Sequence, residues 1–138
     1  MNTQKQTVKT LQKFGVKPSA QRIAIMDYMT KHYIHPTADT VYSGLVSKMP
    51  TLSKTTVYNT LSLLAQKKAI RELHIDEKNV RYDGDISQHA HFCCKKCEKI
   101  FDMPIMVEFK ALEANGFVIT ESHQYHWGYC PDCNKALK

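Results

Sequence analysis

Four of the five cysteines form two Cys-x-x-Cys pairs, Cys94 with Cys97 and Cys130 with Cys133. A two-residue spacer lets both thiolates of a pair reach the same ion, and four thiolates complete a tetrahedral shell around Zn²⁺. Such a shell leaves no coordination position open for chemistry, so we predict a structural zinc. The 32 residues between the pairs exceed the roughly 15 to 20 of a simple zinc ribbon, so this segment must fold to bring the pairs together.

Two other uses of these cysteines stay open on the residues alone. A Cys-x-x-Cys pair could carry out redox chemistry, or the thiols could be free. The odd number of cysteines, and an opening segment without the apolar stretch of an export signal, favour metal thiolates over disulfides. The fifth cysteine, Cys93, faces away from Cys94 if the strand alternates, and we expect a buried apolar thiol there.

A second group of residues offers harder donors. His89 and His91 lie two apart, which places both imidazoles on one face of a strand, and Asp83 and Asp102 supply carboxylates nearby in the sequence. Imidazole together with carboxylate suits Fe²⁺, Mn²⁺ or Zn²⁺. The alternative is two histidines that share a solvated sheet face through alternation alone.

An enzyme is the main competing class of function. Zinc deaminases combine a His-x-Glu motif with Pro-Cys-x-x-Cys, but this chain has no His-x-Glu, and Pro131 lies inside the second cysteine pair. The residues therefore argue against a deaminase, and we predict that the protein is not an enzyme. A zinc-stabilised interaction module without a regulatory role stays open if the histidine and aspartate cluster is incidental.

The net charge of +6 is unevenly distributed over the 138 residues. Residues 1–82 hold 13 Lys/Arg against 5 Asp/Glu, whereas residues 83–138 hold 6 against 8. A basic half attracts polyanions such as nucleic acid, and all five cysteines lie in the other half, so we predict two modules with different tasks. No run approaches the roughly 20 apolar residues of a membrane span, and we expect a soluble, cytosolic protein.

The basic half has the pattern of a winged helix-turn-helix domain. We predict four helices: residues 7–14, a helix capped by Ser19 that stops before Pro36, a helix capped by Thr37 that Pro50 closes, and residues 54–67 capped by Ser53. The apolar period then changes from 3.6 to 2 around residues 70–74 and 80–82, which indicates a β-hairpin. In such a domain the last helix before the hairpin enters the DNA major groove.

The rest of the chain is predicted to be a hinge, residues 83–87, and a small unit, residues 88–138. This unit should contain strands around residues 91–93, 99–101, 117–119 and 126–129, with a helix over about 105–114. The fold class is therefore α+β, an N-terminal winged helix-turn-helix domain, residues 1–82, followed by a C-terminal α/β dimerisation domain. Exposed strand edges in so small a unit favour a homodimer.

Several motifs, in this order and approximate spacing, resemble the ferric uptake regulator (Fur) family over nearly the whole chain. They are His35-Pro36-Thr37-Ala38-Asp39, Ser53-Lys54-Thr55-Thr56-Val57-Tyr58-Asn59-Thr60-Leu61, Arg81-Tyr82-Asp83, His89-Ala90-His91 and the two cysteine pairs. The resemblance implies a dimeric, metal-dependent repressor that binds operator DNA, with zinc on the four paired cysteines. It also implies a regulatory Fe²⁺ or Mn²⁺ bound by His35, Asp83, His89, His91 and Asp102; by itself, His35 would count as a loop histidine.

The resemblance is strongest to the peroxide-responsive (PerR) branch, because iron-sensing relatives tend to have Glu at the position of Asp102. In that branch bound Fe²⁺ reacts with hydrogen peroxide, a ligand histidine is oxidised, and the repressor releases DNA. His35 and His89 match the oxidised positions. The alternative within the family is an iron- or zinc-uptake repressor that senses metal abundance. A further family site uses positions aligned with Gln88 and Ala90, which bind metal poorly, and we predict no third site although Glu108 and His123 lie near its other ligands.

The helix over residues 54–67 should present its polar side to DNA. Val57, Leu61 and Leu64 turn inward, which leaves four candidate DNA-binding residues outward: Lys54, Thr55, Tyr58 and Asn59. These side chains can contact both phosphates and base edges. Tyr58 resembles the family tyrosine that packs on thymine methyls, and Lys17 and Arg22 match basic positions that approach the DNA backbone or minor groove. For any single lysine, the alternative is a merely solvated side chain.

Overall fold

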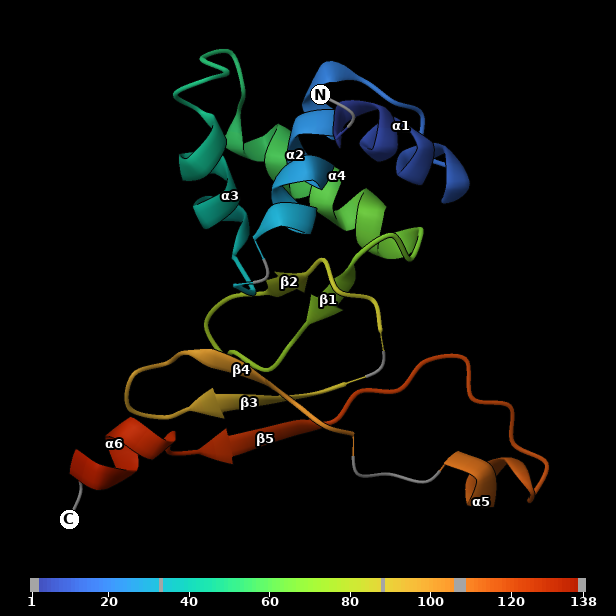
Figure 1. Ribbon diagram of the computed structural model, residues 1–138, viewed down its shortest axis with the longest axis vertical. Helices are drawn as coiled ribbons and strands as arrows, with labels where there is room; N and C mark the ends of the chain where they lie inside the picture. The colour runs from blue at the N-terminus through green and yellow to red at the C-terminus, as the bar shows by residue number, and fades with distance from the viewer. Residues whose placement is uncertain (1–2, 33, 88, 106–108, 137–138) are drawn as a thin grey trace. The chain divides into compact units, whose positions relative to one another are not determined.

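The computed structural model describes residues 3–32, 34–87, 89–105 and 109–136. The chain divides into two compact units, Met1–Ile86 and Ser87–Lys138. The boundary between these units falls within the segment that the sequence predicts as a hinge. Each unit has its own secondary structure (Figure 1).

Four helices and a hairpin build the first unit: α1 (Thr3–Lys13), α2 (Ala20–Lys31), α3 (Ala38–Leu45), α4 (Lys54–Gln66), β1 (Arg71–Leu73) and β2 (Arg81–Asp83). The two strands pair antiparallel, with Glu72 opposite Tyr82. The first helix begins four residues earlier than the apolar pattern predicts, because Gln4, Lys5 and Gln6 are good helix formers although they are exposed.

Side-chain caps start three of the helices where the sequence places them. Ser19, Thr37 and Ser53 each accept a hydrogen bond from the backbone N–H three residues further on, at distances of 3.2, 3.2 and 3.0 Å. These bonds satisfy amides that the first helical turn leaves without intrahelical partners. Among the described residues, no helix combines the length and the apolar composition that a membrane crossing requires.

One apolar core holds the first unit together. Its fully buried members come from every helix and from the hairpin, and they include Leu11, Ile25, Met29, Val41, Val57, Leu61, Leu64, Ile70 and Tyr82. The predicted inward residues of α4 are therefore the ones that are buried, and the opposite side of this helix is left for another task.

The second unit is a three-stranded sheet with two short helices. It contains β3 (Ala90–Cys94), β4 (Ile100–Met103), α5 (Phe109–Glu113), β5 (Tyr125–Gly128) and α6 (Pro131–Ala136). The strand order is β4-β3-β5, with β4 antiparallel and β5 parallel to β3. The parallel strand β5 pairs with the central strand β3 and brings residues 130–136 beside the turn that follows β3 (Figure 1).

The prediction of a strand over residues 117–119 is wrong. These residues have no regular secondary structure, and Phe117 and Val118 are 66% and 86% exposed. A strand needs a hydrogen-bonded neighbour, and within the described part of the unit the sheet consists of β4, β3 and β5 alone. The predicted helix over 105–114 is shorter, Phe109–Glu113, and residues 106–108 lie outside the described residues.

Candidate metal centres and nucleic-acid interface

The four paired cysteines converge in the second unit. Each offers a sulfur atom, and these four atoms all lie within 4.8 Å of one another. Cys94 ends β3 and Cys97 lies in the turn before β4, whereas Cys130 and Cys133 flank the start of α6. The sulfur atoms of Cys97 and Cys130, far apart in the sequence, are 3.9 Å apart. The sheet topology thus closes the long gap between the two pairs.

Backbone N–H groups donate hydrogen bonds to this cluster and so favour the thiolate form of Cys94. The N–H groups of Cys97 and Cys130 donate to the sulfur of Cys94 at 3.5 and 3.4 Å. Burial raises the pKa of Cys94, but these amides, with that of Lys96, outweigh burial and lower the pKa to about 6. The hydrogen bond to Cys130, followed by burial, raises the pKa of Cys133 to about 12. Four sulfur donors so close together fit tetrahedral Zn²⁺, which would displace the thiol protons on binding.

Cys93 lies outside the four-sulfur cluster. It is half-buried in the centre of β3, in register with Ile100 and Trp127. Its neighbour Cys94 is fully buried and faces the opposite side of the sheet, as strand alternation requires. The predicted orientation of Cys93 away from the cluster fits this pattern, although its thiol is only partly covered.

In the first unit, His35 and Asp83 form a buried pair. The imidazole Nε2 of His35 lies 3.5 Å from the carboxylate Oδ2 of Asp83, and the two side chains are 4% and 0% exposed. The other oxygen of Asp83 accepts the backbone N–H of Asp85 at 2.9 Å. A buried carboxylate requires compensating partners, and an imidazole and an amide supply them here.

Two hydrogen bonds to backbone carbonyl groups place this pair. Tyr82 donates its N–H to the carbonyl oxygen of Pro36 at 2.9 Å, and Arg81 donates to the carbonyl oxygen of His35 at 3.2 Å. These bonds fasten the loop before α3 to β2. The backbone of His35 has φ of +57°, a left-handed conformation that costs a non-glycine residue on the order of 1 kcal/mol. The backbone of His35 is therefore strained, and the rest of the fold must compensate for this strain to keep the histidine beside Asp83.

Gly84 lets the chain leave this pair without a collision. A Cβ atom at this position would lie 2.3 Å from the backbone carbonyl oxygen of Met29, near the end of α2. A real Cβ does not approach a backbone oxygen so closely, so only glycine fits without a shift of the backbone. Gly84 lies in the segment predicted as a hinge, residues 83–87, and the structure gives it a packing role beside Asp83.

In the second unit, two histidines share one carboxylate oxygen. The Nε2 atoms of His89 and His91 lie 3.2 and 3.5 Å from Oδ1 of Asp102, and the centroids of the two imidazole rings are 4.5 Å apart. The pairing of β3 with β4 sets His91 directly opposite Asp102. The predicted common face of His89 and His91 is therefore present, and Asp102 completes a group of two nitrogen donors and one oxygen donor.

These donors can hold a metal ion of intermediate hardness. Imidazole and carboxylate suit Fe²⁺, Mn²⁺ and Zn²⁺, and His91 and Asp83 are each 1% exposed, so little solvent competes for them. Of the five predicted donors, the first unit holds one histidine and one aspartate, and the second holds two histidines and one aspartate.

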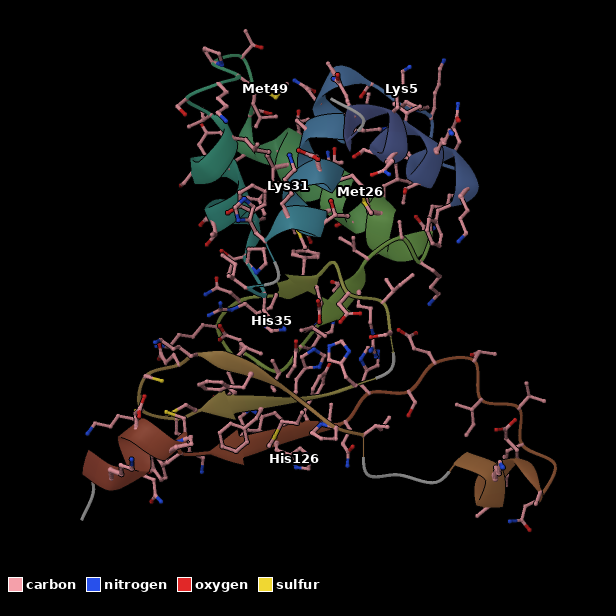
Figure 2. All side chains as sticks on the ribbon, viewed as in Figure 1. Lys5, Met26, Lys31, His35, Met49 and His126 are labelled. Atoms are coloured by element: carbon pink, nitrogen blue, oxygen red, sulfur yellow. The ribbon has the colours of Figure 1, made fainter. Side chains whose placement is uncertain are left out.

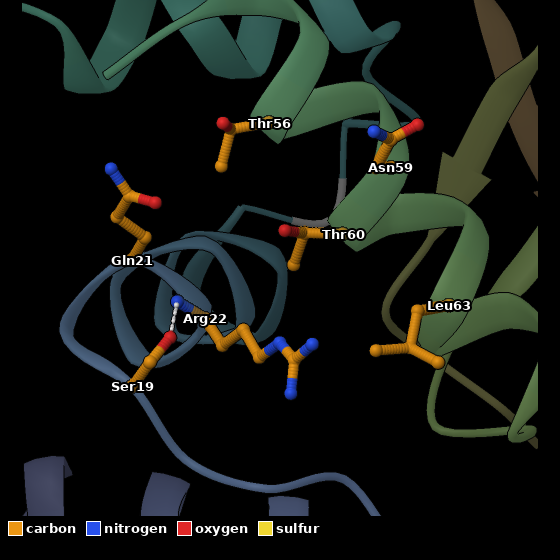
Figure 3. A pocket seen from close by; sticks show the side chains of 7 residues that line it. All are labelled: Ser19, Gln21, Arg22, Thr56, Asn59, Thr60 and Leu63. Carbon is orange, nitrogen blue, oxygen red and sulfur yellow. Dashed lines mark hydrogen bonds between the residues drawn. The ribbon is translucent and has the colours of Figure 1, made fainter. Parts of the chain in front are cut away.

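The outer side of α4 carries exposed polar side chains. Thr55, Tyr58 and Asn59 are exposed, and the Tyr58 side chain is 54% accessible. Figure 3 shows Asn59, Thr56 and Thr60 of α4 around a hollow of about 390 Å³ that the first turn of α2 closes on its other side. An aromatic ring left in solvent on a helix of a basic unit fits a surface that contacts nucleic acid.

Of the three basic candidates, Arg22 lines this hollow, and both Arg22 and Lys54 have local contacts. Arg22 donates to the carbonyl oxygen of Lys17 at 2.9 Å, which ties the loop before α2 to its first turn. Lys54 lies 3.9 Å from Asp39 and 5.7 Å from the ring centroid of Tyr42. Lys17 is exposed. All three charges remain accessible enough to meet phosphate groups.

We predict no third metal site in this chain. The residues near the position of that family site form a local contact network instead. His123 Nε2 lies 2.9 Å from Glu121 Oε1, and the Tyr125 hydroxyl lies 3.2 Å from His123 Nδ1. Ala90 is fully buried and offers no side-chain donor. Gln88 and Glu108, the other positions considered, lie outside the described residues.

The chain is similar to known regulators along most of its length. The model of the ferric uptake regulator family matches residues 13–125. The peroxide operon regulator of Bacillus subtilis (strain 168) is 35% identical over 135 residues, covering 95% of this chain and 93% of that protein. The solved structure of GAS PerR-Zn-Zn shares 30% identity, with a TM-score of 0.53 and coverage of 96% and 87%. The structure of the ferric uptake regulator from Francisella tularensis with iron shares 25%, with a TM-score of 0.69 and coverage of 88% and 96%.

Proposed function

The chain belongs to the ferric uptake regulator family, and from this premise we propose that it is a metal-dependent DNA-binding transcriptional repressor that senses peroxide. The observation that carries the proposal is the division of five nitrogen and oxygen donors into two preformed groups, one in each unit. The 35% identity to a peroxide operon regulator over almost the whole chain supports the peroxide branch. Regulation of transcription, rather than an enzymatic reaction, is the activity of this family.

Two kinds of metal serve the proposed function. Zn²⁺ would be held by Cys94, Cys97, Cys130 and Cys133, whose four-sulfur shell fits a structural ion. A similar structure is that of PerR with zinc. Fe²⁺ or Mn²⁺ would be held by the harder set of His35, Asp83, His89, His91 and Asp102, and the Francisella tularensis relative was solved with iron.

A single regulatory ion held by both groups would couple the two units. His35 and Asp83 belong to the unit that carries α4, whereas His89, His91 and Asp102 belong to the unit that carries the sheet. An ion that needs all five donors stabilises only those orientations of the units in which the donors converge. Metal binding then acts as a population shift toward the DNA-binding arrangement, and loss of the ion releases it.

Peroxide sensing requires a reaction at one of the ligands. With Fe²⁺ bound, the ion supplies one-electron reduction of hydrogen peroxide close to the imidazoles. The net change at the protein is His + H₂O₂ → oxo-His + H₂O, in which a ring carbon loses hydrogen and gains oxygen. We assign this change to His35 or His89. The oxidised ring is a poorer donor, so the two units lose their link.

DNA recognition would fall to α4 and the first turn of α2. The exposed side chains on the outer side of α4 are Lys54, Thr55, Tyr58 and Asn59, and we expect the Tyr58 ring to contact base edges. Lys17 and Arg22 would meet phosphates. A DNA-binding repressor works where DNA is accessible, and we accordingly place the protein in the cytoplasm.

A homodimer would present two copies of α4 to successive half-sites. The sheet of the second unit supports this arrangement, because Phe101 and Met103 alternate on one face of β4 and are 37% and 39% exposed. Phe92 lies directly opposite Phe101 on β3 and extends the same apolar face. Two such faces cover each other in a dimer with an isologous interface.

The deciding experiment compares DNA binding of zinc-loaded protein with Fe²⁺ or Mn²⁺, before and after hydrogen peroxide. We expect both metals to support binding, and peroxide to abolish binding only with Fe²⁺. Mass spectrometry should then find one added oxygen on the peptide that contains His35 or His89. Retention of binding with Fe²⁺ after peroxide, with neither peptide oxidised, would favour the uptake-repressor alternative, which senses the metal itself.

A further inference from the structure

A groove lies between α1 and the start of α2. Its volume is about 400 Å³, and its lining comprises Gln4, Lys5, Val8, Lys9, Gln12 and Ile23. Lys5 projects outward from α1 in Figure 2. We propose that this groove receives the sugar–phosphate backbone of DNA that flanks the sequence contacted by α4. This inference rests on the proposed DNA-binding function and enlarges its footprint.

The positive charge of residues 1–26 favours an anionic partner. Residues 1–26 contain five basic residues and no aspartate or glutamate. Lys5 and Lys9 are one helical turn apart, so their like charges repel and weaken α1. The first turn of α1 also has no acidic residue to complement the helix dipole. A polyanion bound beside these lysines would neutralise their charges and so remove the repulsion that destabilises α1.

The groove has the chemical composition of a backbone-binding surface. The ammonium groups of Lys5 and Lys9 are both exposed, and the side-chain amides of Gln4 and Gln12 supply further hydrogen-bond donors. Val8 and Ile23 are half-buried and give an apolar floor on which deoxyribose can rest. Nothing in this set distinguishes one base from another, so contact here adds affinity without sequence preference.

The groove continues the surface already assigned to DNA. Arg22 lines the hollow between α2 and α4, and the next residue, Ile23, lines the groove between α2 and α1. Figure 3 shows Arg22 extending from α2 between Ser19 and the α4 side chains. The first turn of α2 therefore forms a ridge with α4 on one side and Lys5 and Lys9 on the other. A duplex that contacts α4 can extend past this ridge.

Lys13 provides an internal control on the same helix. It carries the same charge as Lys5 and Lys9 and is also exposed, but its ammonium lies 5.5 Å from the ring centroid of Phe14. It is not among the residues that line the groove. A contribution from overall charge alone would make Lys13 as important as its two neighbours, whereas a backbone contact in the groove makes it less important.

The test uses a duplex selected from a random-sequence pool by the metal-loaded wild-type protein. The affinity is measured for this core duplex and for the same core extended by about ten base pairs at each end. The variants are Lys5→Gln with Lys9→Gln, and Lys13→Gln alone as control. Glutamine removes the charge while it keeps the helix propensity of these positions, and circular dichroism verifies the fold.

We expect the wild type and Lys13→Gln to bind the extended duplex several-fold more tightly than the core. The double variant should lose this difference. Its slope of log affinity against log salt concentration should fall by roughly 0.9 for each lysine that meets a phosphate. Equal losses for Lys13→Gln and the double variant, or unchanged salt slopes, would overturn the inference.

The two proposals fail in distinguishable ways. If the double variant retains metal-dependent binding to the core and also retains the preference for extended DNA, the groove proposal is wrong and the regulator remains. If the wild type binds no duplex in a metal-dependent manner, the proposed function is wrong. If the double variant binds both duplexes normally but no longer binds an acidic peptide that the wild type binds, the groove serves a protein partner instead, and the proposal fails.

Discussion

His35 Nε2 lies 3.5 Å from Asp83 Oδ2, and both side chains are almost completely buried. Hydrogen bonds from Tyr82 to the carbonyl oxygen of Pro36 and from Arg81 to that of His35 hold the two segments together. In the proposed regulatory site, this pair would supply two of the five donors already in place. A preformed half-site lowers the entropy lost when the ion and the other donors assemble.

Replacing Asp83 by asparagine tests its role as a ligand. The substitution keeps the size of the side chain but removes the charge that attracts a cation, so we expect the dissociation constant for Mn²⁺ to rise at least about tenfold. Titration calorimetry on zinc-loaded protein measures this constant. Asp39→Asn serves as control because Asp39 is exposed and lies outside the donor set; an unchanged constant for Asp83→Asn would contradict the assignment.

Cys97 and Cys93 allow a matched comparison of two thiols. Cys97 belongs to the predicted zinc site, whereas Cys93 lies outside the four-sulfur cluster. Cys97 is exposed and Cys93 is half-buried, so Cys97→Ser removes little packing. We expect Cys97→Ser to lower the zinc content below one ion per protomer and to destabilise the second unit, because a structural zinc contributes folding energy. Cys93→Ser should retain zinc. The measurements are metal analysis and thermal unfolding, and full zinc retention by Cys97→Ser is the contrary result.

The ion pair of Asp76 with Arg81 gives a pH-dependent contribution to stability. The two groups are 3.0 Å apart and mostly buried. Burial raises the pKa of Asp76, but the backbone N–H of Lys78 and the guanidinium of Arg81 outweigh it and lower the pKa below the ordinary value of 3.8. The pair therefore stabilises the folded state above pH 3.8, and this contribution is lost as the pH falls through the lower, folded-state pKa.

Asp76→Asn measures that contribution. At neutral pH we expect the variant to unfold more easily by about 1 kcal/mol or less, as is usual for ion pairs near the surface. The difference in unfolding free energy between wild type and variant should shrink as the pH falls below 3.8 and vanish once the pH is below the lowered folded-state pKa of Asp76. Urea denaturation at a series of pH values tests this expectation. A difference in unfolding free energy that grows on acidification would contradict it.

Tyr58 and Lys17 should affect DNA binding in different ways. Tyr58→Ala removes an exposed ring from α4 and should weaken binding to a selected operator by about 1–3 kcal/mol while leaving non-specific binding nearly intact. Lys17→Ala should weaken both, because a phosphate contact is independent of sequence. Gel-shift assays with operator and random duplexes separate the two effects. Equal losses with Tyr58→Ala would reject base recognition.

Local chemistry explains why most elements were predictable. Ser19, Thr37 and Ser53 cap helices at their expected starts, and the change of apolar period after residue 69 marks the hairpin. The prediction failed at residues 117–119, where three apolar residues in succession suggested a strand. An apolar run has strand propensity, but pairing depends on distant neighbours that periodicity does not reveal.

The candidate metal sites were predictable to different degrees. Cysteine spacing alone indicated the four-sulfur cluster. His35 was recognisable only through the family resemblance, because its position beside Asp83 depends on the register of β2 and on hydrogen bonds from Tyr82 and Arg81. No local sequence pattern predicts that Gly84 packs against the backbone of Met29. Such contacts depend on tertiary structure and become visible only once the chain is folded.

The most direct test of the central claim is the operator affinity of zinc-loaded protein with and without the regulatory ion. Zinc is retained on the four cysteines, and the second site is emptied with a mild chelator and then refilled with Mn²⁺. Zinc content is measured in both samples. We predict that the emptied protein binds operator at least about tenfold more weakly and that Mn²⁺ restores the affinity, because the ion stabilises one arrangement of the two units. Equal affinity in the two states, with zinc intact, would contradict the account.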